Sequence, residues 1–449
     1  MPRFPPVCYR APRALNTRPI PTDLPEALTV SAAQASEMTA LASRARAAGR
    51  ALSRAGGARR TAGLLSMASA LEAAQAEVLA ANAADVTDAR ARGISGAMLD
   101  RLTLDEKALV SMARGLREVA AQEDPLGEVE ALRVRPNGLR VGRMRIPLGV
   151  VGIVYEARPN VTVDAAGLCL KSGNATLLRG GSEAHRSNAA LVECLRAALT
   201  RADLPADAVL SLPSTDRAWI LAMVQAEGLV DLVIPRGGEA LIRFVTAHAR
   251  VPVIQHYKGV CHVFVDRAAH LDDAVEICLN AKVQRPGVCN AMETLLVHAD
   301  VADAFLPRVA AALTRAGVEL RGCPRTCALV PEASAADDTD WAAEYLDLVL
   351  AVRVVDDLDA AVAHIERWGS DHTESIVSQD YGAVNRFLAE VNSAVVMANA
   401  STRFADGAQL GLGAEIGIST SRLHAYGPMG ARELTTQKFV VYGSGHVRT

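Results

Sequence analysis

The stretch QRPGVCN, residues 284–290, places a cysteine in a loop that contains proline and glycine. It follows a helix-patterned run and precedes the strand-like run from Thr294 to His298. Further upstream, short β-branched runs alternate with amphipathic runs, which is the pattern of a nucleotide-binding α/β domain. A thiol beside a dinucleotide site suggests redox chemistry through an acyl-enzyme.

The composition is that of an enzyme acting on a small molecule. At 449 residues, 50% of them apolar, the chain is too long for one simple core, so two or three subdomains are expected. A net charge of -3 and a pI near 6.4 give no reason to expect nucleic acid or a membrane surface as a partner. Eight scattered cysteines and the absence of a secretory or membrane-spanning run predict free thiols in a cytoplasmic protein.

The first 30 residues differ from the rest of the chain. They are rich in Pro and Arg and lack a hydrophobic period, so we expect a disordered leader. A transit peptide is disfavoured by the prolines, whereas an over-extended start is plausible because Met38 lies in a helix-patterned segment. Residues 31–120 are Ala-rich with Leu, Met and Val at helical spacing, which predicts a helical layer.

Residues 128–146 are expected to form a hairpin arm. Two strand-like runs flank Pro136, Asn137 and Gly138, and this combination is typical of a tight turn. A solvated edge is one interpretation of its arginines. Because a two-stranded arm is only marginally stable alone, we favour an oligomerisation element, formed together with residues 428–449.

The middle of the chain predicts a doubly wound, largely parallel sheet of the Rossmann type. The expected strands are residues 149–155, 175–178, 209–212, 231–234, 251–256 and 262–265, and the expected helices are 161–171, 187–202, 216–227 and 239–249. Residues 31–127 and 147–270 would then form the cofactor domain. Residues 271–427 would form a second α/β domain that carries the cysteine.

Three glycine- or proline-containing loops follow the predicted strands, where ligands of such sheets bind. Glycine lets backbone N–H groups approach phosphate oxygens, although any single Gly pair more often only turns the chain. No G-x-G-x-x-G motif occurs, and the C-x3-C of Cys323 and Cys327 lacks a second ligand pair, so we expect no metal site. The loops are EARPN (156–160), RGG (179–181) and PRGG (235–238), from which Arg179, Gly180, Gly181, Arg236, Gly237 and Gly238 are candidate cofactor ligands.

Several longer motifs resemble the gamma-glutamyl phosphate reductase family, the glutamate-5-semialdehyde dehydrogenases of the aldehyde dehydrogenase superfamily. They are VYEARPNVTVD (154–164), RGGSE (179–183), GVCH (259–262), RPGVCN (285–290), NASTRF (399–404), GLGAEIG (411–417) and HAYGPMG (424–430). The likeness runs from about Met38 to the C-terminus. It implies an aldehyde dehydrogenase-like fold and NADPH-dependent reduction of L-glutamyl 5-phosphate, with phosphate release, in proline biosynthesis. It also implies a homo-oligomer and an association with glutamate 5-kinase.

The resemblance assigns roles to individual residues. It makes Cys289 the nucleophile that forms a thioester, and it gives the Asn160 side chain and the Cys289 backbone N–H the role of oxyanion donors. Glu344 would hold the nicotinamide ribose, with a solvated helix-end carboxylate as the alternative. Arg179 would suit the 2′-phosphate of NADP(H).

The substrate carries a carboxylate, an ammonium and a phosphate, so its pocket needs matching charges. Arg158, Arg285 and Arg403 are candidates for the anionic groups, with Glu156 or Asp164 for the ammonium, although each alone could be a structural charge. The histidines His256, His262 and His424 are given no catalytic role.

One departure from the wider superfamily is informative. Oxidising members carry a glutamate that activates water to hydrolyse the thioester, and Gln255 stands at that place in this chain. An amide cannot accept the proton, which favours a reductase. The alternatives are another acyl-phosphate or acyl-CoA reductase of the same scaffold, and a non-catalytic oligomeric binding protein.

Overall fold

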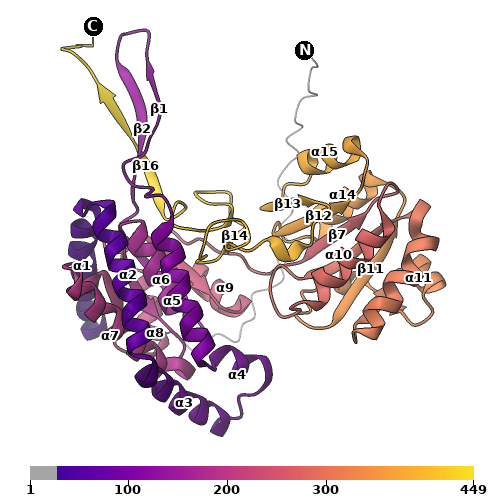
Figure 1. Ribbon diagram of the computed structural model, residues 1–449, viewed down its shortest axis with the longest axis horizontal. Coiled ribbons are helices and arrows are strands. Elements are labelled where there is room, and N and C mark those ends of the chain that lie inside the picture. The colour runs from indigo at the N-terminus through magenta and orange to yellow at the C-terminus, as the bar shows by residue number, and fades with distance from the viewer. Residues whose placement is uncertain (1–27, 449) are drawn as a thin grey trace.

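A computed structural model describes residues 28–448 as two α/β lobes and a projecting arm (Figure 1). The first lobe is built on a four-stranded parallel sheet with strand order β5-β4-β3-β6. Apolar side chains cover both of its faces, as a doubly wound sheet requires. The strands are β3 (Val150–Tyr155), β4 (Ala175–Arg179), β5 (Val209–Ser211) and β6 (Leu232–Arg236).

Helices cover both faces of this sheet. The helices predicted for residues 31–120 are confirmed, although they are divided between the two faces and do not form a single layer. The first of them begins where Ser31 and Gln34 form a reciprocal capping box. Leu28 and Val30 pack on the core, so these two residues of the predicted leader are ordered; residues 1–27 lie outside the described residues. The helices are α1 (Ala32–Arg54), α2 (Gly57–Ala73), α3 (Gln75–Ala91), α4 (Gly96–Leu102), α5 (Glu106–Ala121), α6 (Asn160–Lys171), α7 (His185–Arg201), α8 (Arg217–Val224) and α9 (Glu239–His248).

Two of the segments predicted as strands of this sheet do not belong to it. Residues 251–256 contribute only an isolated bridge between Val253 and Val233. The segment β7 (Cys261–Val265) is a strand, but it pairs with β8 and β12 of the second lobe. The second lobe therefore begins no later than Cys261, and not at residue 271. A short apolar run predicts a buried strand without specifying its neighbours, which is why the sequence misplaced it.

The second lobe contains a seven-stranded parallel sheet with order β10-β9-β11-β8-β7-β12-β13. Its central strands are buried on both faces, and the apolar clusters on them form its core. The further strands are β8 (Met292–His298), β9 (Glu319–Gly322), β10 (Ser334–Ala335), β11 (Val349–Val355), β12 (Thr373–Val377) and β13 (Val395–Ala398). The helices are α10 (Leu271–Val283), α11 (Ala299–Arg315), α12 (Pro324–Leu329), α13 (Asp338–Trp341), α14 (Leu358–Trp368) and α15 (Tyr381–Glu390).

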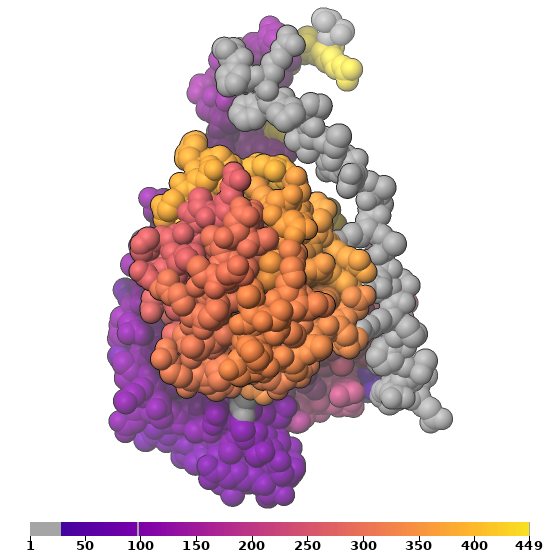
Figure 2. Space-filling view, turned by 90° about the vertical axis from the view of Figure 1, so that its right-hand side faces the viewer, coloured from indigo at the N-terminus to yellow at the C-terminus, as the bar shows by residue number. Residues whose placement is uncertain are grey.

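The predicted hairpin is present and projects from the body of the molecule (Figure 1). Strands β1 (Val129–Val134) and β2 (Arg140–Pro147) pair antiparallel through a turn in which Gly138 has a φ of 85°. Strand β16 (Thr435–Tyr442) adds to the other edge of β2, which makes a three-stranded sheet. In Figure 2 the second lobe faces the viewer, and the arm is visible behind and above this lobe.

The remaining small sheet pairs β14 (Ile418–Ser419) with β15 (Gly427–Pro428). Residue 428 thus belongs to this sheet, and the C-terminal part of the arm sheet begins at Thr435. Across residues 28–448, no single helix has the length and apolarity needed to cross a membrane. Helices α2 and α3 reach such a composition only as a pair bent by 67°.

Candidate active site

Cys289 lies in the loop that joins α10 to β8, and both ends of this loop are fixed by buried polar contacts. Lys282, near the end of α10, forms an ion pair of 2.6 Å with Glu293 in β8, and both side chains are 0% exposed. The Asn290 side-chain amide donates to the carbonyl of Ala405 at 2.8 Å. The loop therefore holds a half-buried cysteine on a rigid frame.

A second segment approaches this loop so closely that only glycine fits. A Cβ added to Gly259 would lie 1.9 Å from the carbonyl oxygen of Cys289. Cys261 donates its thiol hydrogen to the same carbonyl, with 3.1 Å between sulfur and oxygen, and burial raises the pKa of Cys261 well above its ordinary value. The Glu344 carboxylate accepts from the Gly259 amide at 2.8 Å, and burial raises the pKa of Glu344. The structure thus places Glu344 beside the cysteine loop.

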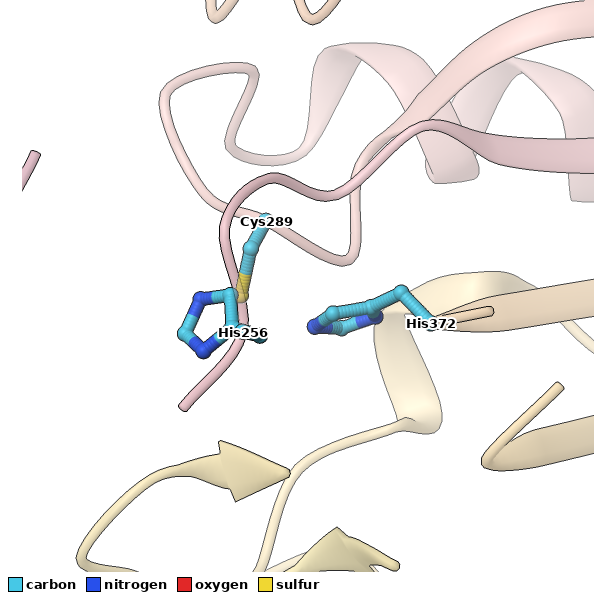
Figure 3. Close-up of side chains that lie close together, drawn as sticks. All are labelled: His256, Cys289 and His372. Atoms are coloured by element: carbon cyan, nitrogen blue, oxygen red, sulfur yellow. The ribbon is translucent and has the colours of Figure 1, made fainter. Parts of the chain in front are cut away.

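Two histidines flank Cys289, an arrangement that no sequence pattern indicated. His256 and His372 each offer a ring nitrogen, and with the Cys289 sulfur the three atoms all lie within 4.8 Å of one another (Figure 3). The two rings meet edge-on with centroids 5.6 Å apart. Burial lowers the pKa of His372 to about 4, so its imidazole is neutral at physiological pH. No spacing rule links these residues, because they come from three separate segments.

Arginines gather around the cysteine. The pKa of the Arg158 side chain is lowered to about 10, mainly by burial and further by the positive charges of Arg236, Arg101 and Arg285, while Cys289 opposes this change. The loop after β3, which contains Arg158, therefore lies within electrostatic range of the Cys289 thiol. Arg101, which the sequence did not single out, comes from α4 and donates to the Gly287 carbonyl at 3.0 Å. It therefore connects the first lobe to the cysteine loop.

Arg403 lines a cavity of about 290 Å³ beside the same loop. Its Nε donates to the Gln284 side-chain oxygen at 2.7 Å. Burial lowers the pKa of Arg403, as does the charge of Arg285, while Asp406 and Cys289 raise it. Asp406, like His372 and Arg101, was not singled out from the sequence. The remaining lining residues are Asn280, Phe404 and Gln409.

The two acidic candidates for the substrate ammonium lie outside the lining of the Arg403 cavity. Glu156 is exposed and accepts from the Gly238 amide at 3.0 Å, and its carboxylate also fills the space where Gly237 would carry a Cβ. Asp164 accepts from the Asn160 side chain at 3.1 Å within α6. Burial raises the pKa of Asp164 to about 6, although Asn160 and Arg236 oppose the change. Neither carboxylate lines the Arg403 cavity.

Arg236 extends away from the loop of which it is part. Its guanidinium would contact a Cβ at Gly417 at 3.0 Å, and it interacts electrostatically with Arg158 and Asp164. The side chain is therefore on the cysteine side of the site. Of the PRGG loop, Gly238 is the position whose added Cβ would meet nothing within 4 Å.

Arg179 ends β4, and Arg179 and Gly180 border a narrow pocket with Ser214 and Thr215, whereas Gly181 follows without lining it. A Cβ at Gly180 would lie 2.0 Å from the side-chain nitrogen of Asn188, so a side chain at this position would require Asn188 to move. Arg179 donates to the Thr215 carbonyl, and its Nε is buried without a hydrogen-bond partner among residues 28–448. Burial lowers the pKa of Arg179. This group of donors suits an anion.

Comparison with known proteins identifies the family. The sequence pattern of the Aldehyde dehydrogenase family matches residues 18–326. Gamma-glutamyl phosphate reductase of Geobacter metallireducens is 58% identical over 385 residues, which cover 86% of this chain and 92% of the relative. That of Geotalea daltonii is 55% identical over 414 residues, which cover 92% of this chain and 99% of the relative.

Solved structures agree with the sequence comparison. The crystal structure of gamma-glutamyl phosphate reductase from Thermotoga maritima superposes with a TM-score of 0.89 at 46% identity, covering 92% of this chain and all of that one. The aldehyde dehydrogenase-like fold predicted from the motifs is confirmed, and the family implies a nicotinamide cofactor. The chain is a member of the gamma-glutamyl phosphate reductase family, within the aldehyde dehydrogenase superfamily.

Proposed function

We propose that this chain reduces L-glutamyl 5-phosphate to L-glutamate 5-semialdehyde with NADPH, releasing phosphate, as a step of proline biosynthesis. The names of the relatives at 55–58% identity support the reaction. The observation that carries the proposal is the half-buried Cys289 thiol held within range of Arg158 and Arg403. A cysteine nucleophile surrounded by cations matches a substrate whose reacting carbon bears a phosphate.

Substrate binding follows from the charges around the thiol. The cavity beside Arg403 receives the amino-acid end of the substrate, with Arg403 on the carboxylate and Asp406 on the ammonium. Arg158 and Arg285 then face the phosphate, which lies closer to Cys289. This arrangement replaces Glu156 and Asp164 by Asp406 as the ammonium partner, because Asp406 shares a cavity with Arg403.

Attack by sulfur forms the carbon–sulfur bond and breaks the bond between the acyl carbon and phosphate. The electron pair leaves on phosphate, which takes up the proton that the thiol loses. The cationic residues stabilise the negative charge that develops on the departing oxygen. Phosphate is a good leaving group, so this step needs no strong general acid.

When bound, the reduced nicotinamide supplies the hydride that converts the thioester to a thiohemiacetal. The Asn160 side chain and the Cys289 amide donate to the resulting oxyanion. Asn160 is held at the start of α6 by its hydrogen bond to Asp164, which fixes the direction of its amide. Collapse of the oxyanion breaks the carbon–sulfur bond, releases the aldehyde and returns the thiolate, which takes a proton from solvent.

Gln255 protects the thioester from water. Its side-chain oxygen is buried and accepts no hydrogen bond from residues 28–448, and an amide has no basicity with which to activate a water molecule. The thioester therefore persists until hydride arrives or, in reverse, until phosphate attacks. This property favours a reductase over a hydrolytic dehydrogenase.

The cofactor proposal is NADP(H). The pocket at the end of β4 is lined by Gly180 and by Arg179, whose buried Nε has no hydrogen-bond partner among residues 28–448. These features fit an adenosine ribose that carries a 2′-phosphate. Gly181, Gly237 and Gly238 are proposed to approach the pyrophosphate, and Glu344 remains the proposed ribose ligand.

Two further proposals concern partners and location. Exposed apolar side chains on the arm, among them Val134 and Phe439, support its role in a homo-oligomer. The association with glutamate 5-kinase stays a prediction from the resemblance. The seven described cysteines are free thiols, which supports a reducing compartment and hence the cytoplasm.

The proposed function is tested by following NADPH formation from glutamate semialdehyde, NADP and phosphate. Cys289→Ser should lose turnover while its circular dichroism and melting temperature match the parent. Cys194→Ser is a matched control, because Cys194 is also a half-buried free thiol but lies on α7. Equal rates for Cys289→Ser and the parent would end the covalent mechanism. Replacement of phosphate by coenzyme A distinguishes an acyl-CoA reductase.

A further inference from the structure

We propose that His256, Cys289 and His372 form a binding site for Zn²⁺, and that the bound metal reversibly blocks the nucleophile. The proposal goes beyond the reaction, and its inhibitory part rests on the proposed role of Cys289. The three ligand atoms lie within 4.8 Å of one another, and they form the only such group among residues 28–448. Figure 3 shows the two rings on either side of the sulfur.

His372 has the environment of a metal ligand. The side chain is 0% exposed, and its Nδ1 lies 2.8 Å from the Thr373 hydroxyl oxygen. When Nδ1–H donates to that oxygen, Nε2 carries the free lone pair, which is the tautomer that a hydrogen-bonded second shell imposes on a ligating histidine. Nε2 is buried and has no partner in the described chain, and the outer edge of the ring faces Cys289 (Figure 3). An unpartnered buried nitrogen directed at a thiol indicates a missing ligand.

The donor set selects the metal. Two imidazole nitrogens and one thiolate are borderline-soft ligands that suit Zn²⁺, whereas Mg²⁺ and Ca²⁺ prefer oxygen. Three protein ligands leave the fourth position of a tetrahedral ion open to water. The other half-buried thiols, Cys194 and Cys327, belong to no comparable group in the described residues.

Binding requires a small closure of the site. With zinc about 2.0–2.1 Å from nitrogen and about 2.3 Å from sulfur, tetrahedral ligand atoms lie roughly 3.3–3.6 Å apart, so separations of as much as 4.8 Å must shorten by up to about 1.5 Å. His256 is in a segment without helix or strand and can move toward His372, and rotation about the Cα–Cβ bond of Cys289 can bring its sulfur closer while the loop backbone stays in place. Carboxylates of Glu344, Glu374 and Glu415 interact with His372 and favour positive charge there, which offsets the nearby arginines.

Coordination would switch off the nucleophile. The Cys289 thiol binds as the thiolate and releases its proton to solvent. Its lone pair then forms the metal–sulfur bond and cannot attack an acyl carbon or an alkylating reagent. Removal of the ion by a chelator restores the thiol, so the block is reversible and leaves no covalent change.

The first test measures binding without turnover. The full-length protein is titrated with Zn²⁺ alone in a buffer that does not chelate metals, and alkylation of the Cys289 peptide by iodoacetamide is quantified by mass spectrometry. Zn²⁺ should protect Cys289, and EDTA should remove the protection. With Co²⁺ in place of Zn²⁺, the parent should show a sulfur-to-cobalt charge-transfer band that Cys289→Ser lacks. Both measurements test metal binding without turnover, so they remain informative even if the proposed reaction is wrong.

Ligand variants make the assignment specific. His256→Gln and His372→Gln should each raise the Zn²⁺ concentration needed for half protection by at least about 10-fold. The matched control is His270→Gln, because His270 is exposed and precedes α10, at the end of that helix remote from the cysteine loop. Because His256 lies in a segment without helix or strand, we expect His256→Gln to fold. This variant still tests the site if His372→Gln, which alters a buried residue, does not fold. The same protection curve for the parent and both ligand variants, or an unchanged cobalt band in Cys289→Ser, would overturn the proposal.

Discussion

Lys282 and Glu293 form a fully buried ion pair of 2.6 Å that joins the last turn of α10 to the second residue of β8. The cysteine loop spans the gap between these two residues, so the pair fixes both ends of the loop. Removing one partner leaves a buried, uncompensated charge. We therefore expect Lys282→Met to lower the free energy of unfolding by about 3–5 kcal/mol, measured by urea denaturation. The double variant Lys282→Met/Glu293→Leu should recover most of this loss; a double variant as unstable as the single one would contradict the buried-charge explanation.

Gly259 should be intolerant of any side chain. An added Cβ would lie 1.9 Å from the Cys289 carbonyl oxygen, and neither backbone can yield without moving the nucleophile. Gly259→Ala should cost about 1–3 kcal/mol of stability and lower kcat, measured with saturating substrates. Gly115→Ala is the control, because Gly115 lies inside α5 with nothing within 4 Å of an added Cβ. Wild-type kcat in Gly259→Ala would show that the loop is not held as described.

Substitution of Asp406 and substitution of Glu156 should raise KM for two different substrates. Asp406 shares the cavity of Arg403, whereas Glu156 accepts from the Gly238 amide in the proposed cofactor loop. A hydrogen bond to a charged group contributes about 1.5–3 kcal/mol, so Asp406→Asn should raise KM for glutamate semialdehyde by about 10-fold or more. Glu156→Gln should instead raise KM for NADP. Steady-state kinetics with each substrate varied in turn separates the two, and the reverse pattern would restore Glu156 as the ammonium partner.

Asp164 gives the stability a pH dependence of predictable sign. Burial raises its pKa from 3.8 to about 6, so the folded state binds the proton more tightly than the unfolded state. Its contribution to stability is complete below pH 3.8 and is lost as the pH rises through about 6. Asp164→Asn should therefore be more stable than the parent at pH 7, by at most about 3 kcal/mol, with the difference shrinking toward pH 4. Thermal melts across this range measure it; a constant difference would rule out titration of Asp164 as the cause.

Gln255→Glu should introduce a hydrolytic activity. A carboxylate at this position can accept a proton from water and release glutamate from the thioester. The expected result is NADPH formation from glutamate semialdehyde without phosphate, with stoichiometric glutamate. Gln255→Asn controls for the change in shape at this position. If Gln255→Glu releases no glutamate, position 255 is not equivalent to the base of oxidising aldehyde dehydrogenases.

Local patterns predicted much of the fold. The strands that begin at Val150, Ala175, Val209 and Leu232 lie where apolar runs indicated, and the Asn137-Gly138 turn closes the predicted hairpin. Such features depend on neighbouring residues and are therefore visible in sequence. The partners of β7 were misassigned because a strand buried on both faces carries no mark of which sheet it joins.

The site was less predictable than the fold, because contacts between residues that are distant in the sequence leave no local pattern. Cys289 was found because its loop is a contiguous motif, whereas His372 and Arg101 reach it from distant elements. Arg101 belongs to a helical layer in which an arginine normally marks a solvated face. Only the packing of the two lobes brings it to Gly287.

A thioester on Cys289 that water does not hydrolyse should be visible in a rapid-mixing experiment without phosphate. Enzyme is mixed with glutamate semialdehyde and NADP, and NADPH absorbance is followed. We expect a burst of about one NADPH per active site, then no further turnover until phosphate is added. No burst, or steady NADPH formation in the absence of phosphate, would contradict it.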